Sequence, residues 1–341
     1  MTDVAALAGV GSATVDRVLN ERGNVSEEVG RRVIAAAREL GLRRILPSSH
    51  HRHVRVNAIL PRAERPFFVR LSSELRRHAT RLGSGITIHR THLKDESAET
   101  VAEAILRPGF DAVLVAAPDH PKVHAAIADL ADQGRPVVTI DTDVPGSRRL
   151  AYAGIDHYKA GRSAAFFLGR MAPPTLHPGK VIVLSNHAGF HVHAERIRGL
   201  TDQLATDAPH LTLAEIVRGG DDPQVSEVKL REAFRRHPET MGVYNVGAGN
   251  RGVVAAIRAA ILPRTPIFIG HELTAVTWAS LRDGSMTLTI DQSPELQVHF
   301  ALEVLMNHFG FEGASHAEPP YVSNVPFVLY GPQNLPDTAP S

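Results

Sequence analysis

The sequence contains no cysteine among its 341 residues. This absence excludes disulfide bonds, cysteine nucleophiles and thiolate metal sites. No run approaches the 18 consecutive apolar residues that would predict a membrane-spanning helix. The N-terminal segment also lacks the basic stretch, apolar run and cleavage site of a signal peptide. We therefore expect a cytoplasmic protein that has no membrane partner.

The sequence also lacks a large net charge of either sign, because 37 lysines and arginines face 36 aspartates and glutamates. This balance argues against a protein coated with positive charge for general nucleic-acid binding. The hydrophobic content of 43% argues against disorder, and the length suffices for two or three domains. One stretch departs from the balance, since five arginines face only Glu39 between Arg38 and Arg55. This stretch is either a solvated linker or a basic strap that contacts phosphates.

Three short helical patterns occupy residues 1–42, and apolar residues recur at helical spacing in each. A turn containing Gly11 separates the first two patterns. Ser26 is typical of the residue that caps the start of the third, and Gly41 ends it. Two helices joined by a glycine-containing turn and braced by a third predict a helix-turn-helix, although a small interaction bundle remains an alternative.

The second of these helices exposes small residues near its start and carries Arg17 one turn later. A helix that enters the major groove of DNA needs this arrangement, because bulky residues at its start would hold it away from the bases. The arginine can then reach a phosphate or a guanine. The pattern therefore favours DNA binding.

Residues 3–42 include DVAALAGVGSATVDRVLN and VSEEVGRRVIAAARELG, which resemble the DNA-binding headpiece of the lactose/galactose-repressor family of bacterial transcription regulators. The resemblance implies binding to double-stranded operator DNA. We expect a homodimer, because a two-fold dimer on a palindrome roughly doubles the contacts of one headpiece. The resemblance also assigns base-reading and backbone-positioning roles. The base-reading residues would be Ser12, Ala13 and Arg17, and the backbone-positioning residues would be Thr14 and Asn20.

Three of the departures from this family pattern concern the second helix and the hinge. Gly11 stands where a serine usually caps the second helix, and Asp16 replaces another serine. The Asp16 carboxylate would lie near phosphates and should weaken non-specific binding. Family members usually continue with a short hinge helix that wedges a leucine into the minor groove. In the corresponding hinge, residues 43–55, His51 takes the place of that leucine, so we expect a basic strap in which His51 and Arg52 contact DNA.

After residue 55 the sequence alternates between short apolar strands and amphipathic helices, in two successive series. This pattern predicts two α/β lobes with doubly wound parallel sheets over residues 56–330. We expect that the helical headpiece precedes this domain and that a short tail follows it. The expected boundaries are 56–156 plus 293–320 for lobe 1, 158–291 plus 321–330 for lobe 2, and 331–341 for the tail. The segment 321–330 is expected to form one strand.

Ligands of doubly wound sheets bind at the carboxyl ends of the strands. The polar residues predicted at such ends are Asp119, Asp141, Asn245, Glu272, Asp291 and Gln292. Carboxylates and amides suit a polyhydroxylated ligand, because they form paired hydrogen bonds with neighbouring hydroxyls. Each residue could equally cap a turn, where aspartate and asparagine are common.

Several motifs of this region resemble those of ribose-type periplasmic binding proteins and their repressor relatives. RPFFVRL is similar to N-P-F-F, AERIRGL to R-x-x-G-[FLW], and IFIGHEL stands in the place of G-[FY]-D. The resemblance implies a sugar or polyol effector bound by Phe67, Phe68, Asp141, Arg196, Asn245, Glu272 and Gln292. Asn250 competes with Asn245 for its role. Glu272 replaces the expected aspartate, and His271 beside it puts the usual pentose or hexose in doubt.

Enzymatic and metal-binding motifs are not found in the sequence. His187, His191 and His193 lie close together but not at a metal-ligand spacing such as H-E-x-x-H. No phosphate-binding loop and no G-x-S-x-G nucleophile motif occurs. We therefore expect no metal, no cofactor and no enzyme. The sequence favours a ligand-responsive DNA-binding repressor. A solute-binding protein or a sugar-processing enzyme with the same lobes is the alternative.

Overall fold

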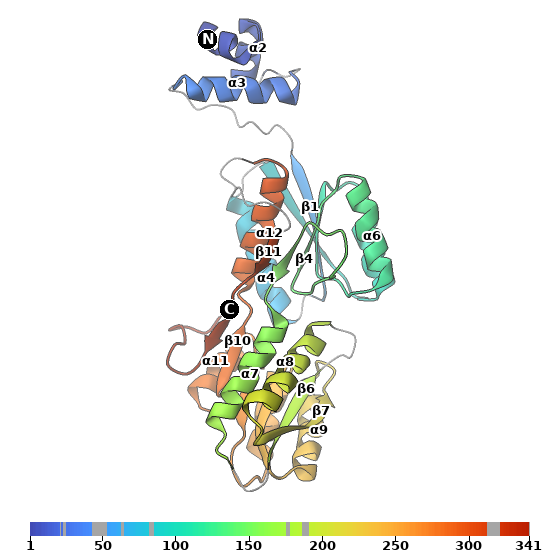
Figure 1. Cartoon of the computed structure of the whole chain (residues 1–341), viewed down its shortest axis with the longest axis vertical. Helices are drawn as coiled ribbons and strands as arrows, with labels where there is room; N and C mark the ends of the chain where they lie inside the picture. The colour runs from blue at the N-terminus through green and yellow to red at the C-terminus, as the bar shows by residue number, and fades with distance from the viewer. Residues whose placement is uncertain are drawn as a thin grey trace.

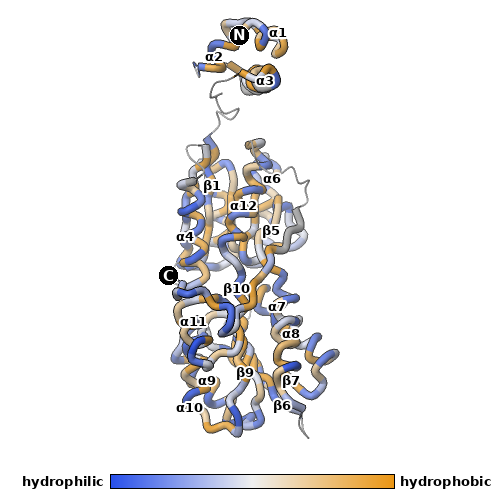
Figure 2. The backbone as a smooth tube through the Cα atoms, turned by 90° about the vertical axis from the view of Figure 1, so that its left-hand side faces the viewer, coloured by the Kyte–Doolittle hydropathy of each residue, from blue (hydrophilic) through white to orange (hydrophobic). Residues whose placement is uncertain are grey.

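The computed structural model describes residues 1–20, 22, 25–42, 53–62, 65–81, 85–174, 178–185, 191–311 and 321–340. Three helices stand at one end of the molecule, and two lobes follow along its long axis (Figure 1). Hydrophobic stretches concentrate along the strands inside each lobe (Figure 2). No helix within these ranges is long and apolar enough to span a membrane.

The N-terminal unit consists of α1 (Thr2–Ala8), α2 (Ser12–Leu19) and α3 (Glu27–Glu39). Its small core is made of aliphatic side chains from all three helices. Gly9 ends α1 in the left-handed conformation, with φ 64°, which a glycine adopts at low cost. Ser26 Oγ accepts a hydrogen bond from Val29 N and supports the start of α3. The predicted three-helix organisation is confirmed.

Lobe 1 contains a fully parallel six-stranded sheet in the order β11-β5-β4-β3-β1-β2. Helices α4 and α12 cover one face, and α5 and α6 cover the other (Figure 1). The strands are β1 (Val54–Leu60), β2 (Ile86–His92), β3 (Ala112–Val115), β4 (Val137–Ile140), β5 (Ala151–Gly154) and β11 (Tyr321–Asn324). The helices are α4 (Pro66–Arg81), α5 (Ala98–Leu106), α6 (Pro121–Asp132) and α12 (Pro294–His308).

Lobe 2 repeats the architecture with the order β12-β10-β9-β8-β6-β7, in which only β12 is antiparallel to its neighbour. Helices α7 and α8 cover one face, and α9, α10 and α11 cover the other. The strands are β6 (Gly179–Ser185), β7 (Leu211–Arg218), β8 (Thr240–Asn245), β9 (Ile267–His271), β10 (Leu288–Asp291) and β12 (Val328–Tyr330). The helices are α7 (His157–Met171), α8 (His191–Asp207), α9 (Pro223–Arg236), α10 (Asn250–Ala259) and α11 (Ala275–Arg282). The predicted pair of doubly wound lobes is confirmed.

The prediction of one strand over residues 321–330 in lobe 2 is wrong. The segment forms two strands, and β11 joins the sheet of lobe 1 while β12 joins that of lobe 2. Pro326 lies between them, and a proline cannot donate a ladder hydrogen bond. The chain therefore crosses between the lobes three times, near residues 155–156, 292–293 and 325–327.

Helices α7 and α8 pack so closely that their contact requires glycine. A Cβ atom on Gly161 would lie 2.0 Å from the carbonyl oxygen of Arg196, and one on Gly199 would lie 2.0 Å from that of Tyr158. Because these neighbours are backbone atoms, neither site can accommodate a methyl group by rotating a side chain. The contact fixes α8, and with it Arg196, relative to α7.

We expect Gly161→Ala to lower the free energy of unfolding by about 1–3 kcal/mol, since overpacking forces the two helices apart. Thermal and urea unfolding followed by circular dichroism would measure this loss. Gly30→Ala is the matched control, because a Cβ atom at this helical glycine meets no atom within 4 Å. Equal stability of the Gly161→Ala variant and the wild type would contradict the close contact.

Candidate functional site

The exposed face of α2 carries the residues predicted to contact DNA. Val15, Val18 and Leu19 are buried against α1 and α3, which turns the opposite side of α2 towards solvent. On that side Ser12, Ala13, Arg17 and Asn20 are exposed, and Thr14 is partly buried. The fold thus places all five on the accessible side of one helix and its end, while their contacts with DNA stay a prediction. His51 and Arg52, predicted to form the basic strap, lie outside the described residues.

Asp16 connects the polar groups at the end of α2. Its carboxylate accepts hydrogen bonds from Asn20 Nδ2 at 2.7 Å and from Arg22 Nη1 at 3.2 Å. The sequence predicts only a repulsive effect of Asp16 on phosphates, and no motif indicates a role for Arg22. Asp16 therefore orients the side chain of Asn20. If Asn20 contacts the DNA backbone, its amide group must serve both Asp16 and the DNA.

A cavity of about 370 Å³ lies between the lobes and is lined by residues of both. It is formed where the carboxyl ends of the two sheets face each other, as doubly wound sheets predict. The non-glycine residues with positive φ in the described ranges are Asp141, Asp221, Glu272 and Ser293, at 51–70°. Three of them line the cavity, and Ser293 lies at a crossing between the lobes. Such backbone conformations are unfavourable and concentrate at functional sites.

Six of the seven predicted ligand-binding residues line this cavity. They are Phe67, Phe68, Asp141, Arg196, Glu272 and Gln292. The prediction placed Asn245 in the lining, but the structure places its side chain behind the lining. Asn245 Nδ2 donates to Asn250 Oδ1 at 2.7 Å, and Asn250 itself lines the cavity. Asn250 lines the cavity in place of Asn245 because the turn after β8 brings Asn250 forward. Asn245 then orients the side chain of Asn250.

Arg196 is buried, with 3% of its surface exposed, and its guanidinium is held by neutral groups. Nε and Nη2 lie 3.2 and 3.1 Å from His157 Nδ1, and Nη1 donates to the carbonyl oxygen of Val246 at 2.6 Å. His157 Nε2 in turn lies 2.8 Å from the backbone oxygen of Asp141. Burial and then the charge of Arg196 lower the pKa of His157 well below its usual value, so its ring is neutral. His157 therefore positions Arg196, a role that no local motif indicated.

The two cavity carboxyl groups at strand ends both have raised pKa values, but to different extents. Burial raises the pKa of Asp141 to about 6, and the positive charges of Arg196 and Arg65 oppose this effect. Burial and then the neighbouring Asp291 carboxylate raise the pKa of Glu272 to about 8. Arg70 lies 3.5 Å from Glu272 but 2.5 Å from Asp291, so its charge mainly compensates Asp291. Near neutral pH, Glu272 is therefore protonated and Asp141 is mostly ionised.

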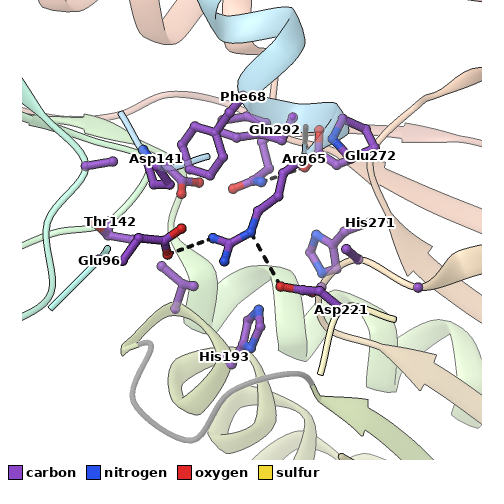
Figure 3. A pocket seen from close by; sticks show the side chains of 18 of the residues that line it. Arg65, Phe68, Glu96, Asp141, Thr142, His193, Asp221, His271, Glu272 and Gln292 are labelled. Carbon is purple, nitrogen blue, oxygen red and sulfur yellow. Dashed lines mark hydrogen bonds and ion pairs between the residues drawn. The ribbon is translucent and has the colours of Figure 1, made fainter. Parts of the chain in front are cut away.

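Two arginines of lobe 1 form ion pairs with carboxylates of lobe 2 beside the cavity. Arg65 lies in the middle of the close-up in Figure 3, with Nη1 3.1 Å from Glu96 Oε2 and Nε 3.5 Å from Asp221 Oδ2. Glu96 belongs to lobe 1 and Asp221 to lobe 2. Arg70, on α4, forms the second bridge to Asp291 at the end of β10. The lobes are thus joined by charge pairs at two points beside the cavity. No pattern in the sequence indicates this role for either arginine.

Glu272 makes the stability of the protein depend on pH. Its carboxyl group stays protonated up to about pH 8 in the folded state, whereas in the unfolded chain it ionises near its ordinary pKa of 4.5. The folded state binds the additional proton between these values, so this contribution to stability falls as pH rises from about 4.5 to 8.

We expect Glu272→Gln to remove this loss, because glutamine does not ionise. As pH rises across this range, the free energy of unfolding of the variant should increase relative to that of the wild type. Proton linkage limits this relative gain to about a few kcal/mol. Urea unfolding at a series of pH values would measure it. Glu295→Gln is the control, since it removes a half-exposed carboxylate near the same Arg70. A difference that is constant with pH would contradict the raised pKa.

Two families of known proteins match this chain. Residues 1–44 match the family described as bacterial regulatory proteins, lacI family, and residues 57–313 match the periplasmic binding protein domain. The chain therefore belongs to the family of the periplasmic binding protein domain, and its N-terminal residues form a lacI-family domain. The expected resemblance and the expected fold class are therefore confirmed.

Individual proteins similar to this chain include a transport protein and a repressor. The ribose import binding protein of Bacillus subtilis is 24% identical over 249 residues, which cover 70% of this chain and 76% of that protein. The ribose operon repressor of the same organism is 30% identical over 169 residues, which cover 48% of this chain and 49% of the repressor. A solute-binding protein from Burkholderia graminis, solved in complex with D-arabinose, has a TM-score of 0.74 at 19% identity, covering 85% of this chain and 99% of its own. The last likeness supports the fold alone.

Proposed function

We propose that this protein is a sequence-specific transcriptional repressor that works as a homodimer and responds to a sugar or polyol bound between its lobes. The observation that carries the proposal is the presence, in one chain, of an exposed α2 face and an interlobe cavity that is lined by charged and apolar side chains. This chain is similar to the ribose operon repressor of Bacillus subtilis, whose name describes a repressor of a sugar operon. The absence of enzymatic motifs fits a regulator.

The cavity supports a polyhydroxylated effector through its charge distribution. The ionised Asp141 accepts hydrogen bonds from hydroxyl groups, and the buried Arg196 donates to hydroxyl oxygens. Phe67 and Phe68 also line the cavity, and their ring centroids lie 5.2 Å apart in an edge-to-face pair. The two rings offer apolar surface to the C–H face of such a molecule. A binding site with these three properties recognises a compact molecule that has both polar and apolar faces.

Regulation would follow from the way the lobes are joined. An effector that contacts Asp141 in lobe 1 and Arg196 in lobe 2 stabilises the arrangement in which the Arg65 and Arg70 bridges are formed. The three crossing segments allow the lobes to rotate as units. In a dimer, such rotation changes the distance between two headpieces on a palindromic operator. The coupling between the two ligands would be of the order of 1–3 kcal/mol, as is typical of allosteric proteins.

A solute-binding protein is the second candidate, favoured by the similarity to the ribose import binding protein along 70% of this chain. It would use the same cavity but not the exposed face of α2. The two candidates therefore differ in whether the chain binds specific DNA.

A gel-shift experiment with the DNA upstream of the protein's own gene tests the proposal. The DNA would be titrated with the full-length protein alone and with a panel of pentoses, hexoses and polyols, against scrambled DNA of the same length. We expect a specific shift whose midpoint changes with one of the compounds. Binding of a compound without any specific DNA shift would instead support the solute-binding candidate.

A further inference from the structure

His271 is a buried polar residue in the wall of the cavity. It is the last residue of β9, has 1% of its surface exposed and directly precedes Glu272. Its backbone oxygen accepts a hydrogen bond from Asn250 Nδ2 at 2.9 Å, which leaves the imidazole as the group available to a ligand. In the sequence it stands where the related motif has phenylalanine or tyrosine.

The hydrogen bond between His271 and Tyr244 defines the tautomer of the ring. Tyr244 is fully buried, and its hydroxyl oxygen lies 2.7 Å from His271 Nε2. Burial raises the pKa of Tyr244, so the phenol keeps its proton. Within the described residues His271 Nε2 is the hydroxyl's hydrogen-bond partner. Donation from the hydroxyl to Nε2 satisfies the phenolic proton, whereas the opposite tautomer would leave that proton buried without an acceptor. The ring therefore carries its own proton on Nδ1.

The Nδ1 atom of His271 is buried and has no hydrogen-bond partner among the described residues. Buried donors of this kind are rare in folded proteins unless something else satisfies them. Burial and then the positive charge of Arg196 lower the pKa of His271, so the ring is neutral and offers a single N–H donor. His271 is one of the residues that line the cavity, so a bound molecule is the candidate partner for this donor.

We propose that His271 is a specificity-determining residue that donates a hydrogen bond from Nδ1 to an oxygen atom of the effector, with Tyr244 as the positioning residue that fixes its tautomer. This inference rests on the proposed function for the existence of the effector. It selects molecules that present an oxygen acceptor, a hydroxyl, ring, carbonyl or carboxylate oxygen, at the His271 wall. A phenylalanine ring in the same position would offer no donor.

Substitutions that each imitate one ring nitrogen provide the binding test. The amide nitrogen of His271→Asn can occupy the region of Nδ1, whereas the longer side chain of His271→Gln reaches the region of Nε2. The probes are D-ribose, D-arabinose and D-allose, titrated calorimetrically into the full-length protein. For the sugar that binds the wild type, we expect about tenfold weaker binding to His271→Gln and His271→Phe, and a change within about threefold for His271→Asn, since one hydrogen bond is involved. Equal affinity of all four proteins would overturn the proposal.

The protein without any sugar provides an independent test. In full-length protein labelled with ¹⁵N-histidine, the signal that disappears in His271→Gln belongs to His271. We expect it to show the Nδ1–H tautomer in the wild type and a mixture of tautomers in Tyr244→Phe. An Nε2–H tautomer in the wild type would overturn the proposal. Failure of all three sugars to bind would count against the effector class of the proposed function, whereas the tautomer is decided by the protein alone.

Discussion

Replacing Arg17 with alanine is expected to weaken binding to the specific DNA site by about ten- to a hundredfold, since a well-placed arginine contact with guanine discriminates by about 1–3 kcal/mol. Arg17 is exposed on α2, one turn after the small residues Ser12 and Ala13, so the helix can approach the bases and bring the guanidinium with it. Fluorescence anisotropy with labelled DNA at several salt concentrations would measure the effect.

The matched control for this variant is Arg170→Ala, which removes the same charge from the last turn of α7 in lobe 2. We expect the control to bind the specific site as the wild type does. The loss in Arg17→Ala should be greater for the specific site than for scrambled DNA. A loss of the same size on both DNAs would mean that Arg17 contacts only phosphates.

Replacing Arg196 with methionine is expected to weaken effector binding by about a hundredfold, because removing one member of a buried charged hydrogen-bond network costs roughly 2–5 kcal/mol. Arg196 connects His157, the Asp141 strand end and the cavity, so its loss leaves an effector oxygen and His157 Nδ1 without a donor. Isothermal titration calorimetry with the sugar that binds the wild type would measure it.

Arg198→Met is the control for Arg196, because Arg198 lies on the same helix but is half-exposed and paired with Glu195. The Arg196→Met variant should still bind specific DNA, since the headpiece has its own core, but this binding should no longer respond to an effector concentration that just saturates the wild type. Effector affinity equal to that of the wild type would contradict the role of Arg196 at the site.

The residues that sequence reasoning located at the cavity share a local signal. Asp141 and Glu272 directly follow buried strands, and Arg196 lies in the first turns of a helix that follows another strand. Because the carboxyl ends of parallel strands meet at one edge, strand patterns alone bring such residues together. The same reasoning could not distinguish Asn245 from Asn250, since Asn245 ends β8, Asn250 follows five residues later, and only the path of the turn decides which one reaches the cavity.

The residues that sequence reasoning missed depend on contacts between distant segments. His157 on α7 can position Arg196 on α8 because Gly161 and Gly199 allow the two helices to pack closely. Arg65 pairs with carboxylates of two different lobes. The spacing of residues in the sequence does not predict such contacts between distant segments. The wrongly predicted strand over 321–330 is different, because Pro326 was visible in the sequence and indicated a break.

The measurement that tests the account most directly is a thermodynamic cycle for the two ligands. The affinity for the specific DNA would be measured with and without saturating effector, and the affinity for the effector with and without saturating DNA. The account predicts that both ratios differ from one, by about 5- to 150-fold, and that they are equal, because coupling between two sites of one molecule is reciprocal. Two ratios of one, obtained with both ligands bound specifically, would show that the cavity does not control the headpiece.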